Sequence, residues 1–217
     1  EEERELTVFI LADISGSIDG GTRGVSKRDR ITELAAVLAF SAMGNNDKVG
    51  AILFSDRIEK FIPPKKGKSH VLRIIREIIE IEPEGKGTDI TNALDHFLSA
   101  MKKRTVSFLL SDFRDSGYED LLKRAGRKHD FVALKIEDPI DLDIPDVGWL
   151  PLKDHESGET KWMRTGSKKD RMRYRAIELE RSENLKRAFA RAGIDSTTIR
   201  TDMPYVKPLM QLFDRRG

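Results

Sequence analysis

Residues 6–17 read LTVFILADISGS, an unbroken apolar run that ends abruptly in a carboxylate and two hydroxyls. The run is short and rich in β-branched residues, which is typical of a strand buried on both faces. Such strands occur in parallel sheets, where the residues that follow them gather at the carboxyl edge and form ligand sites. This stretch therefore predicts a buried first strand over Leu6 to Ala12 and a polar site directly after it.

Three further apolar runs resemble the first, and helical patterns separate them. The runs lie at 49–54, 106–110 and 131–136. Apolar residues between them recur at helical spacing around 31–42, 71–79 and 90–101. This alternation predicts an α/β fold, with a doubly wound, mostly parallel central sheet and helices on both faces.

The last third of the chain predicts a small insertion followed by further helices and a strand. The expected elements are a β-hairpin from 149–152 and 161–163, a helix over 168–192, a strand over 196–199 and a helix over 204–213. We expect Trp149 and Trp162 to pair across the hairpin. An apolar stripe from Met172 to Ala192 predicts a buried face on the long helix, and Gly193 is expected to cap its end. Pro204 suits the first turn of the last helix.

Composition limits the kind of protein. The length of 217 residues, with no repeat or linker, predicts a single domain over 1–217. Thirty-nine basic against thirty-seven acidic residues leave a net charge of +2, which favours a solvated surface over a nucleic-acid footprint. The absence of cysteine excludes disulfides, thiolate metal sites and cysteine nucleophiles, and agrees with a reducing compartment.

The start of the chain predicts that it is a fragment of a longer protein. It begins Glu1-Glu2-Glu3-Arg4 without Met and enters the first strand almost at once. No apolar run approaches the roughly 18 residues of a membrane helix. We therefore expect a soluble, cytoplasmic fragment that makes no membrane contact itself and lacks an N-terminal region, through which any membrane association would arise.

Two other segments place oxygen-bearing side chains at element ends. Asp112 follows the apolar run at 106–110, and Thr88 lies in the Gly-rich loop 85–89 before a helix. If the strands that end at Asp13 and Asp112 are neighbours where the strand order reverses, these side chains converge. Carboxylates and hydroxyls without His or Cys predict Mg²⁺, with Mn²⁺ or Ca²⁺ as alternatives. Two carboxylates leave such an ion partly positive, so it can attract an Asp or Glu of another protein.

The oxygen-bearing residues occur in the order of a known motif. Asp13-x-Ser15-x-Ser17, Thr88 and Asp112 resemble the metal-ion-dependent adhesion site (MIDAS) of von Willebrand factor A-type domains. The short Asp-x-Ser-x-Ser element is frequent by chance, whereas the ordered set is specific. The resemblance implies that Ser15, Ser17 and Thr88 contact the metal directly or nearly so. It also implies that Asp13 and Asp112 bind it directly or through water.

Further segments of the chain point to one particular family of A-type domains. They lie at 2–6, 38–42, 47–50, 54–59, 87–89 and 146–148. Together they are similar to the bacterial domain of unknown function 58 family over nearly the whole chain. In that family the A-type domain follows its own N-terminal region, sometimes with membrane helices, and the genes commonly neighbour those of MoxR-type AAA+ ATPases. The resemblance therefore implies a Mg-dependent protein-binding module and no enzyme, with no nucleic-acid partner. The module would be an adaptor or assembly factor for such an ATPase or its client.

Three alternatives stay open. The first is a metal-dependent phosphohydrolase of the haloacid-dehalogenase type, but this class needs a second Asp where the chain has Ser15. The second is a structural domain whose site holds no metal, in which Asp13 and the serines only cap a turn. The third concerns Asp56 and Asp115, which we interpret as surface turn residues, with a place on the partner surface as the alternative.

Overall fold

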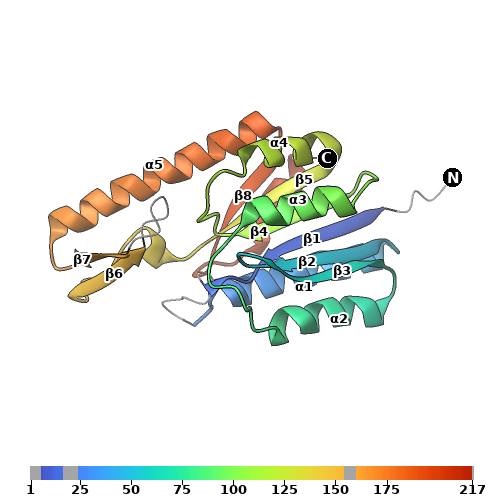
Figure 1. Cartoon of the computed structure of the whole chain (residues 1–217), viewed down its shortest axis with the longest axis horizontal. Coiled ribbons are helices and arrows are strands. Elements are labelled where there is room, and N and C mark those ends of the chain that lie inside the picture. Colours follow the sequence, from blue (N-terminus) through green and yellow to red (C-terminus); the bar gives the residue numbers. More distant parts are fainter. Residues whose placement is uncertain (1–5, 17–23, 154–159, 217) are drawn as a thin grey trace.

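The described part of the chain folds around one six-stranded sheet (Figure 1). The structure is a computed structural model, and it describes residues 6–16, 24–153 and 160–216. The strand order is β3-β2-β1-β4-β5-β8. The strands are β1 (Thr7–Asp13), β2 (Lys48–Phe54), β3 (Ile58–Lys65), β4 (Val106–Ser111), β5 (Asp130–Glu137) and β8 (Asp195–Arg200). Only the pairing of β2 with β3 is antiparallel among these strands, so the predicted α/β class is confirmed.

Strand β1 lies in the middle of the sheet and is buried from Val8 to Asp13. It pairs in parallel with β2 on one side and with β4 on the other. The strand order therefore reverses beside β1. The register places Ala12 next to Leu110, so the residues after β1 and after β4 emerge together at the carboxyl edge.

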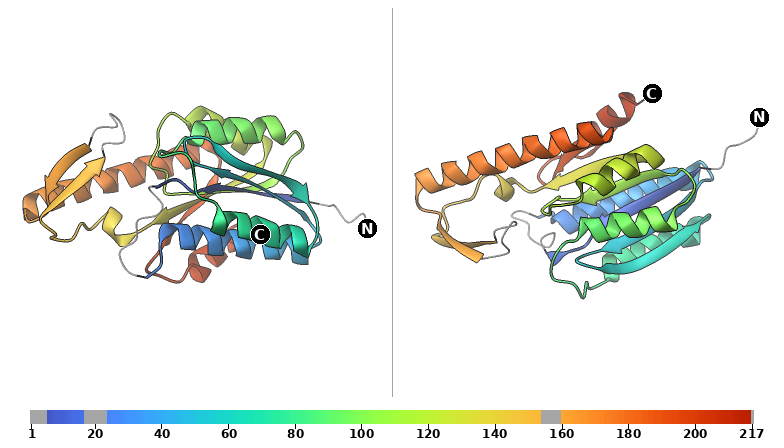
Figure 2. Two further views of the ribbon diagram at one scale, coloured as in Figure 1. Left: turned by 60° about the horizontal axis from the view of Figure 1, so that its bottom comes forward. Right: turned by 45° about the horizontal axis from the view of Figure 1, so that its top comes forward.

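Helices cover both faces of the sheet (Figures 1 and 2). They are α1 (Lys27–Gly44), α2 (Lys68–Glu80), α3 (Ile90–Ala100), α4 (Glu119–Lys128), α5 (Lys168–Ala192) and α6 (Val206–Asp214). One apolar cluster joins α1, α2 and α6 to the sheet through residues such as Leu34 and Ile74. The other joins α3, α4 and α5 through residues such as Phe97 and Leu122. Burial of these two clusters fixes the sheet between its helix layers.

Three elements were not predicted: β3, α4 and the short 3₁₀ helix η2 (Pro139–Asp141). Strand β3 is an edge strand that contains Pro63 and Pro64, which an edge tolerates because one side of the strand is unpaired. Pro204 precedes α6, which begins at Val206, so the predicted place of this proline in the first turn is wrong.

The predicted hairpin forms from β6 (Trp149–Lys153) and β7 (Thr160–Arg164). Its register pairs Trp149 with Arg164 and Trp162 with Pro151. The two tryptophans are thus diagonal neighbours across the hairpin and do not lie directly opposite each other. Both are exposed, at 63% and 65% of their surface.

Helix α5 has the predicted bounds and ends at Gly193, whose φ of 66° is the left-handed cap conformation. The predicted buried stripe is only partly correct. Phe189 and Ala192 are buried, whereas Met172 and Ile177 near the other end are exposed. The first half of α5 extends past the six-stranded sheet together with the hairpin, so that sheet does not cover its apolar residues (Figure 1).

Candidate metal centre

Polar side chains from three segments meet at the carboxyl edge of the sheet. Asp13 is the last residue of β1, and Ser15 follows two positions later. The Thr88 hydroxyl, in the loop before α3, donates a hydrogen bond of 2.8 Å to Ser15 Oγ. The hydroxyl of Ser111, the last residue of β4, donates one of 2.6 Å to Asp13 Oδ2. Asp112 follows directly, so the end of β4 is joined to the end of β1.

Four of the five predicted ligands, Asp13, Ser15, Thr88 and Asp112, therefore lie in one cluster. The fifth, Ser17, lies outside the described residues. Asp13, Ser15 and Asp112 are buried, and Thr88 is half-buried. The sequence therefore predicted the convergence of these four side chains, while their role as metal ligands stays a prediction.

Asp13 is a carboxyl group for which ionisation is unfavourable. Burial, followed by the charge of Asp112, raises the pKa of Asp13 to about 7. Hydrogen bonds from the Ser111 hydroxyl and from the Ser15 backbone N–H, the latter 3.0 Å from Oδ1, act in the opposite direction. A cation next to both carboxylates would favour the ionised form.

Asp112 has the opposite electrostatic environment. Burial would raise its pKa, but the positive charges of Lys27 and Arg114 outweigh burial and hold the pKa below its ordinary value. Lys27 Nζ lies 3.1 Å from Asp112 Oδ2, and the Arg114 backbone N–H donates to Oδ1 at 3.1 Å. Asp112 is therefore ionised at neutral pH, whereas Asp13 is only partly so.

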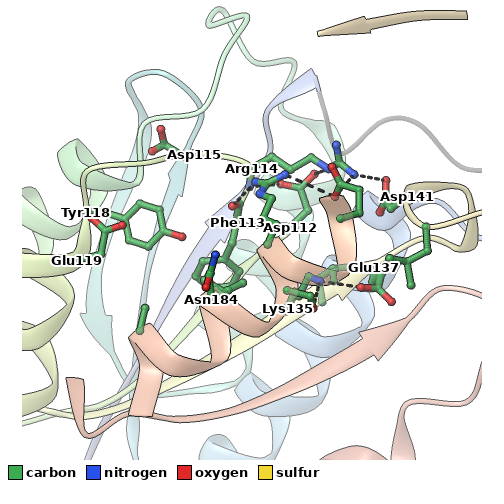
Figure 3. A pocket seen from close by; sticks show the side chains of 17 residues that line it. Asp112, Phe113, Arg114, Asp115, Tyr118, Glu119, Lys135, Glu137, Asp141 and Asn184 are labelled. Atoms are coloured by element: carbon green, nitrogen blue, oxygen red, sulfur yellow. Dashed lines mark hydrogen bonds and ion pairs between the residues drawn. The ribbon is translucent and has the colours of Figure 1, made fainter. Parts of the chain in front are cut away.

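A cluster of charges surrounds Asp112. Lys27 Nζ also lies 2.9 Å from Asp141 Oδ2, and Arg114 reaches the same aspartate at 3.2 Å. Arg114 contacts Glu178 at 3.4 Å as well. Figure 3 shows Asp112, Arg114 and Asp141 together at one side of a pocket between the segment after β4, strand β5 and helix α5.

Lys27, Arg114 and Asp141 were not predicted as part of the site. Their contacts join parts of the chain that lie 85 and 114 residues apart, which no local pattern reveals. One signal was available for Lys27. It is the first residue of α1, where a positive charge is unfavourable beside the helix dipole and a nearby carboxylate would offset that cost.

The loop that carries Thr88 is held by hydrogen bonds to two aspartates of other segments. The Asp56 carboxylate accepts hydrogen bonds from the N–H groups of Lys86 and Gly87 at 3.1 and 3.2 Å. Asp115 accepts one from Ile90 N–H, at the start of α3, at 2.8 Å. The two aspartates interpreted as turn residues thus fix the loop and helix start around Thr88.

Comparison with known proteins now places the chain in a family. Residues 1–184 match the family described as protein of unknown function DUF58. The chain belongs to the DUF58 family. It is 30% identical over 159 residues to the uncharacterized proteins Mb1516 of Mycobacterium bovis and Rv1480 of Mycobacterium tuberculosis, matching 72% of this chain and 50% of each relative. This DUF58 chain thus spans about half the length of those relatives.

Solved structures share the fold of the DUF58 chain. The conserved hypothetical protein BatB from Bacteroides thetaiotaomicron has a TM-score of 0.64 at 19% identity, covering 97% of this chain and 98% of that one. An aerotolerance-related membrane protein from Bacteroides fragilis has a TM-score of 0.62 at 18% identity, covering 97% of each. In the described ranges of the DUF58 chain, no helix is long and apolar enough to cross a membrane.

The donor set of the DUF58 site fits a hard divalent cation. Its carboxylate and hydroxyl oxygens are the ligand type of Mg²⁺, Mn²⁺ and Ca²⁺. Among the described residues, no group of three or more His, Cys, Asp or Glu side chains is placed to hold a metal. A metal at this edge of the sheet would therefore depend on the hydroxyls of Ser15 and Thr88 besides the two carboxylates.

Proposed function

We propose that this DUF58 chain is a Mg²⁺-dependent protein-binding module with a MIDAS-type site. The observation that carries the proposal is the convergence of Asp13, Ser15, Thr88 and Asp112 from three separate segments. The hydrogen bond between Thr88 and Ser15 supports it most directly, because it joins the loop before α3 to the end of β1. These four residues would hold the metal, which supplies positive charge at the carboxyl edge of the sheet.

The proposed ligand is an Asp or Glu side chain of a partner protein. A carboxylate suits a divalent cation that is held by only two carboxylates and otherwise by hydroxyl oxygens. The family resemblance makes a MoxR-type AAA+ ATPase or its client our proposed partner, with the DUF58 chain as adaptor or assembly factor. This role would place the chain in the cytoplasm, with any membrane association supplied from outside the described residues.

Metal binding is tested by calorimetric titration with Mg²⁺ and with Mn²⁺. The wild type should bind, and Asp13→Asn and Asp112→Asn should each weaken binding at least about ten-fold, because each removes a carboxylate from the cluster. Asp120→Asn is the matched control. Asp120 is an exposed α4 residue paired with Lys123 at 3.3 Å, so binding should be unchanged. Wild-type affinity in both site variants would contradict the proposal.

Partner binding is tested by capture of the purified MoxR-type ATPase from the same organism on the immobilised chain. Capture should require Mg²⁺, should be lost with EDTA, and should be lost in Asp13→Asn. Capture that is indifferent to both changes would reject the metal-mediated contact.

The rival function is a haloacid-dehalogenase-type phosphohydrolase. We propose that the chain lacks this activity, since Ser15 occupies the position of the second aspartate and its hydroxyl accepts a hydrogen bond from Thr88. A phosphatase assay with a chromogenic phosphate ester and Mg²⁺ should give no turnover. Turnover that depends on Mg²⁺ and disappears in Asp13→Asn would favour the rival.

A further inference from the structure

Lys27 is a buried cation at the edge of the proposed metal site. Only 2% of its surface is exposed, although lysine is among the residues least often buried. The backbone of Lys27 is held in the first turn of α1, because Ser26 and Asp29 form a capping box there. From there the ammonium reaches Asp112 Oδ2 at 3.1 Å and Asp141 Oδ2 at 2.9 Å.

The charges around Asp112 nearly balance without any metal. Asp112, Asp141 and Glu178 carry three negative charges, and Lys27, Arg114 and Arg181 carry three positive ones, beside the partly ionised Asp13. A divalent cation that approaches Asp112 therefore meets a carboxylate that already has a positive partner. The cation must either repel Lys27 or displace it.

Asp141 is an alternative ionic partner for the displaced Lys27 ammonium. Lys27 contacts both oxygens of Asp141, at 3.0 and 2.9 Å, and a single oxygen of Asp112. It can therefore give up Asp112 and keep an ionic partner. Since burial of an unpaired charge is costly, this second carboxylate makes the exchange feasible.

We infer that Lys27 competes with the divalent cation for Asp112. Lys27 pairs with Asp112 in the metal-free protein and thereby lowers the affinity of the site for the metal. This inference rests on the proposed metal-binding function and describes how that function is regulated. Metal binding and the Lys27–Asp112 ion pair exclude each other in part, because they use the same carboxylate. The ion pair stabilises the metal-free fold and thereby weakens metal binding.

The test replaces Lys27 by methionine, which has a similar length and no charge. Calorimetric titration with Mg²⁺ and Mn²⁺ should give a dissociation constant at least about ten-fold lower than that of the wild type, equivalent to about 1.4 kcal/mol. The thermal midpoint in EDTA should fall, and added Mg²⁺ should raise it more than in the wild type. Lys123→Met makes the same change in an exposed ion pair of α4, and it should leave the affinity unaltered.

A second variant covers the case in which Lys27→Met does not fold. Lys27→Gln removes the charge and keeps an N–H donor for Asp112, so it too should bind Mg²⁺ more tightly than the wild type. Equal or weaker affinity in the folded variants overturns the inference, and the proposed function stands if the wild type binds. Binding by the variants alone supports the inference and rejects the proposed function for the wild type. Absence of binding in all three proteins rejects both.

Discussion

Replacement of Asp13 by asparagine tests the electrostatics of the buried site. Without a cation, burial and the charge of Asp112 raise the pKa of Asp13 from 3.8 to about 7. The folded protein therefore keeps this proton to higher pH than the unfolded chain does. The resulting contribution to stability is fully present below about pH 4 and is lost as the pH rises through about 7. Since one pKa unit corresponds to about 1.4 kcal/mol, the loss is about 4 kcal/mol at most.

The Asp13→Asn variant keeps the size of the side chain and has no charge at any pH. In EDTA at pH 8 we expect it to be more stable than the wild type by about 2 kcal/mol, after allowance for a weakened hydrogen bond with Ser111. The difference should shrink toward zero or reverse near pH 4. Urea unfolding of both proteins over this pH range measures it, and subtraction removes the effect of other titrating groups.

Metal should act on the two proteins differently. Mg²⁺ should stabilise the wild type, because a ligand that binds only the folded state raises the free energy of unfolding, and it should leave Asp13→Asn nearly unchanged. The exposed-site control Asp120→Asn should stay within about 0.5 kcal/mol of the wild type throughout. A variant less stable than the wild type at pH 8 in EDTA, or a difference that does not vary with pH, would show that Asp13 does not have a raised pKa in the folded protein.

Two further predictions concern the glycines of the loop that carries Thr88 and the buried His129. Gly85→Ala should destabilise the fold by about 1 to 3 kcal/mol in urea, because the added methyl would lie 2.1 Å from Ser55 Oγ. Gly87→Ala, whose methyl would lie 3.6 Å from the nearest atom, should cost much less, and equal losses would contradict the steric argument. Burial, helped by the charges of Lys128 and Arg104, lowers the pKa of His129 to about 4, so stability present above pH 6.5 should be lost as the pH falls toward 4. An NMR titration of the His129 ring checks this, and a midpoint near 6.5 would contradict it.

The parallel strands were predictable because burial on both faces leaves an unbroken apolar run. Strand β1 shows this most clearly, with every residue from Val8 to Asp13 buried. Strand β3 lacked such a signal, because an edge strand has one unpaired side and here carries two prolines. Helix α4 is short and charged, and it buries only Leu122 and Ala125, which is too few residues for a helical pattern.

Helix α5 shows that the bounds of a helix are easier to predict from sequence than its burial. Its apolar spacing correctly predicted a helix from 168 to 192, but the spacing carries no information on how far the sheet extends beneath it. Met172 is 63% exposed for this reason, whereas Phe189 lies over the sheet and is buried. The bounds of a helix depend on local sequence, while its burial depends on the tertiary fold.

The candidate site divides in the same way. Asp13 and Asp112 were predictable because both follow buried strands, and neighbouring parallel strands end at one edge. Lys27 and Asp141 were not, because their roles arise only when the start of α1 and the segment after β5 meet at Asp112. The proposed ligands could thus be predicted from sequence patterns. The charged residues that would alter their affinity for a metal became visible only in the structure.

Anomalous X-ray diffraction from crystals grown with Mn²⁺ would locate the proposed metal among its ligands. We expect one strong peak bounded by the oxygens of Asp13, Ser15, Thr88 and Asp112, which disappears when the crystals are washed with EDTA. A well-ordered structure without density at that place, in which the Lys27 ammonium still lies against Asp112 at saturating Mn²⁺, would contradict it.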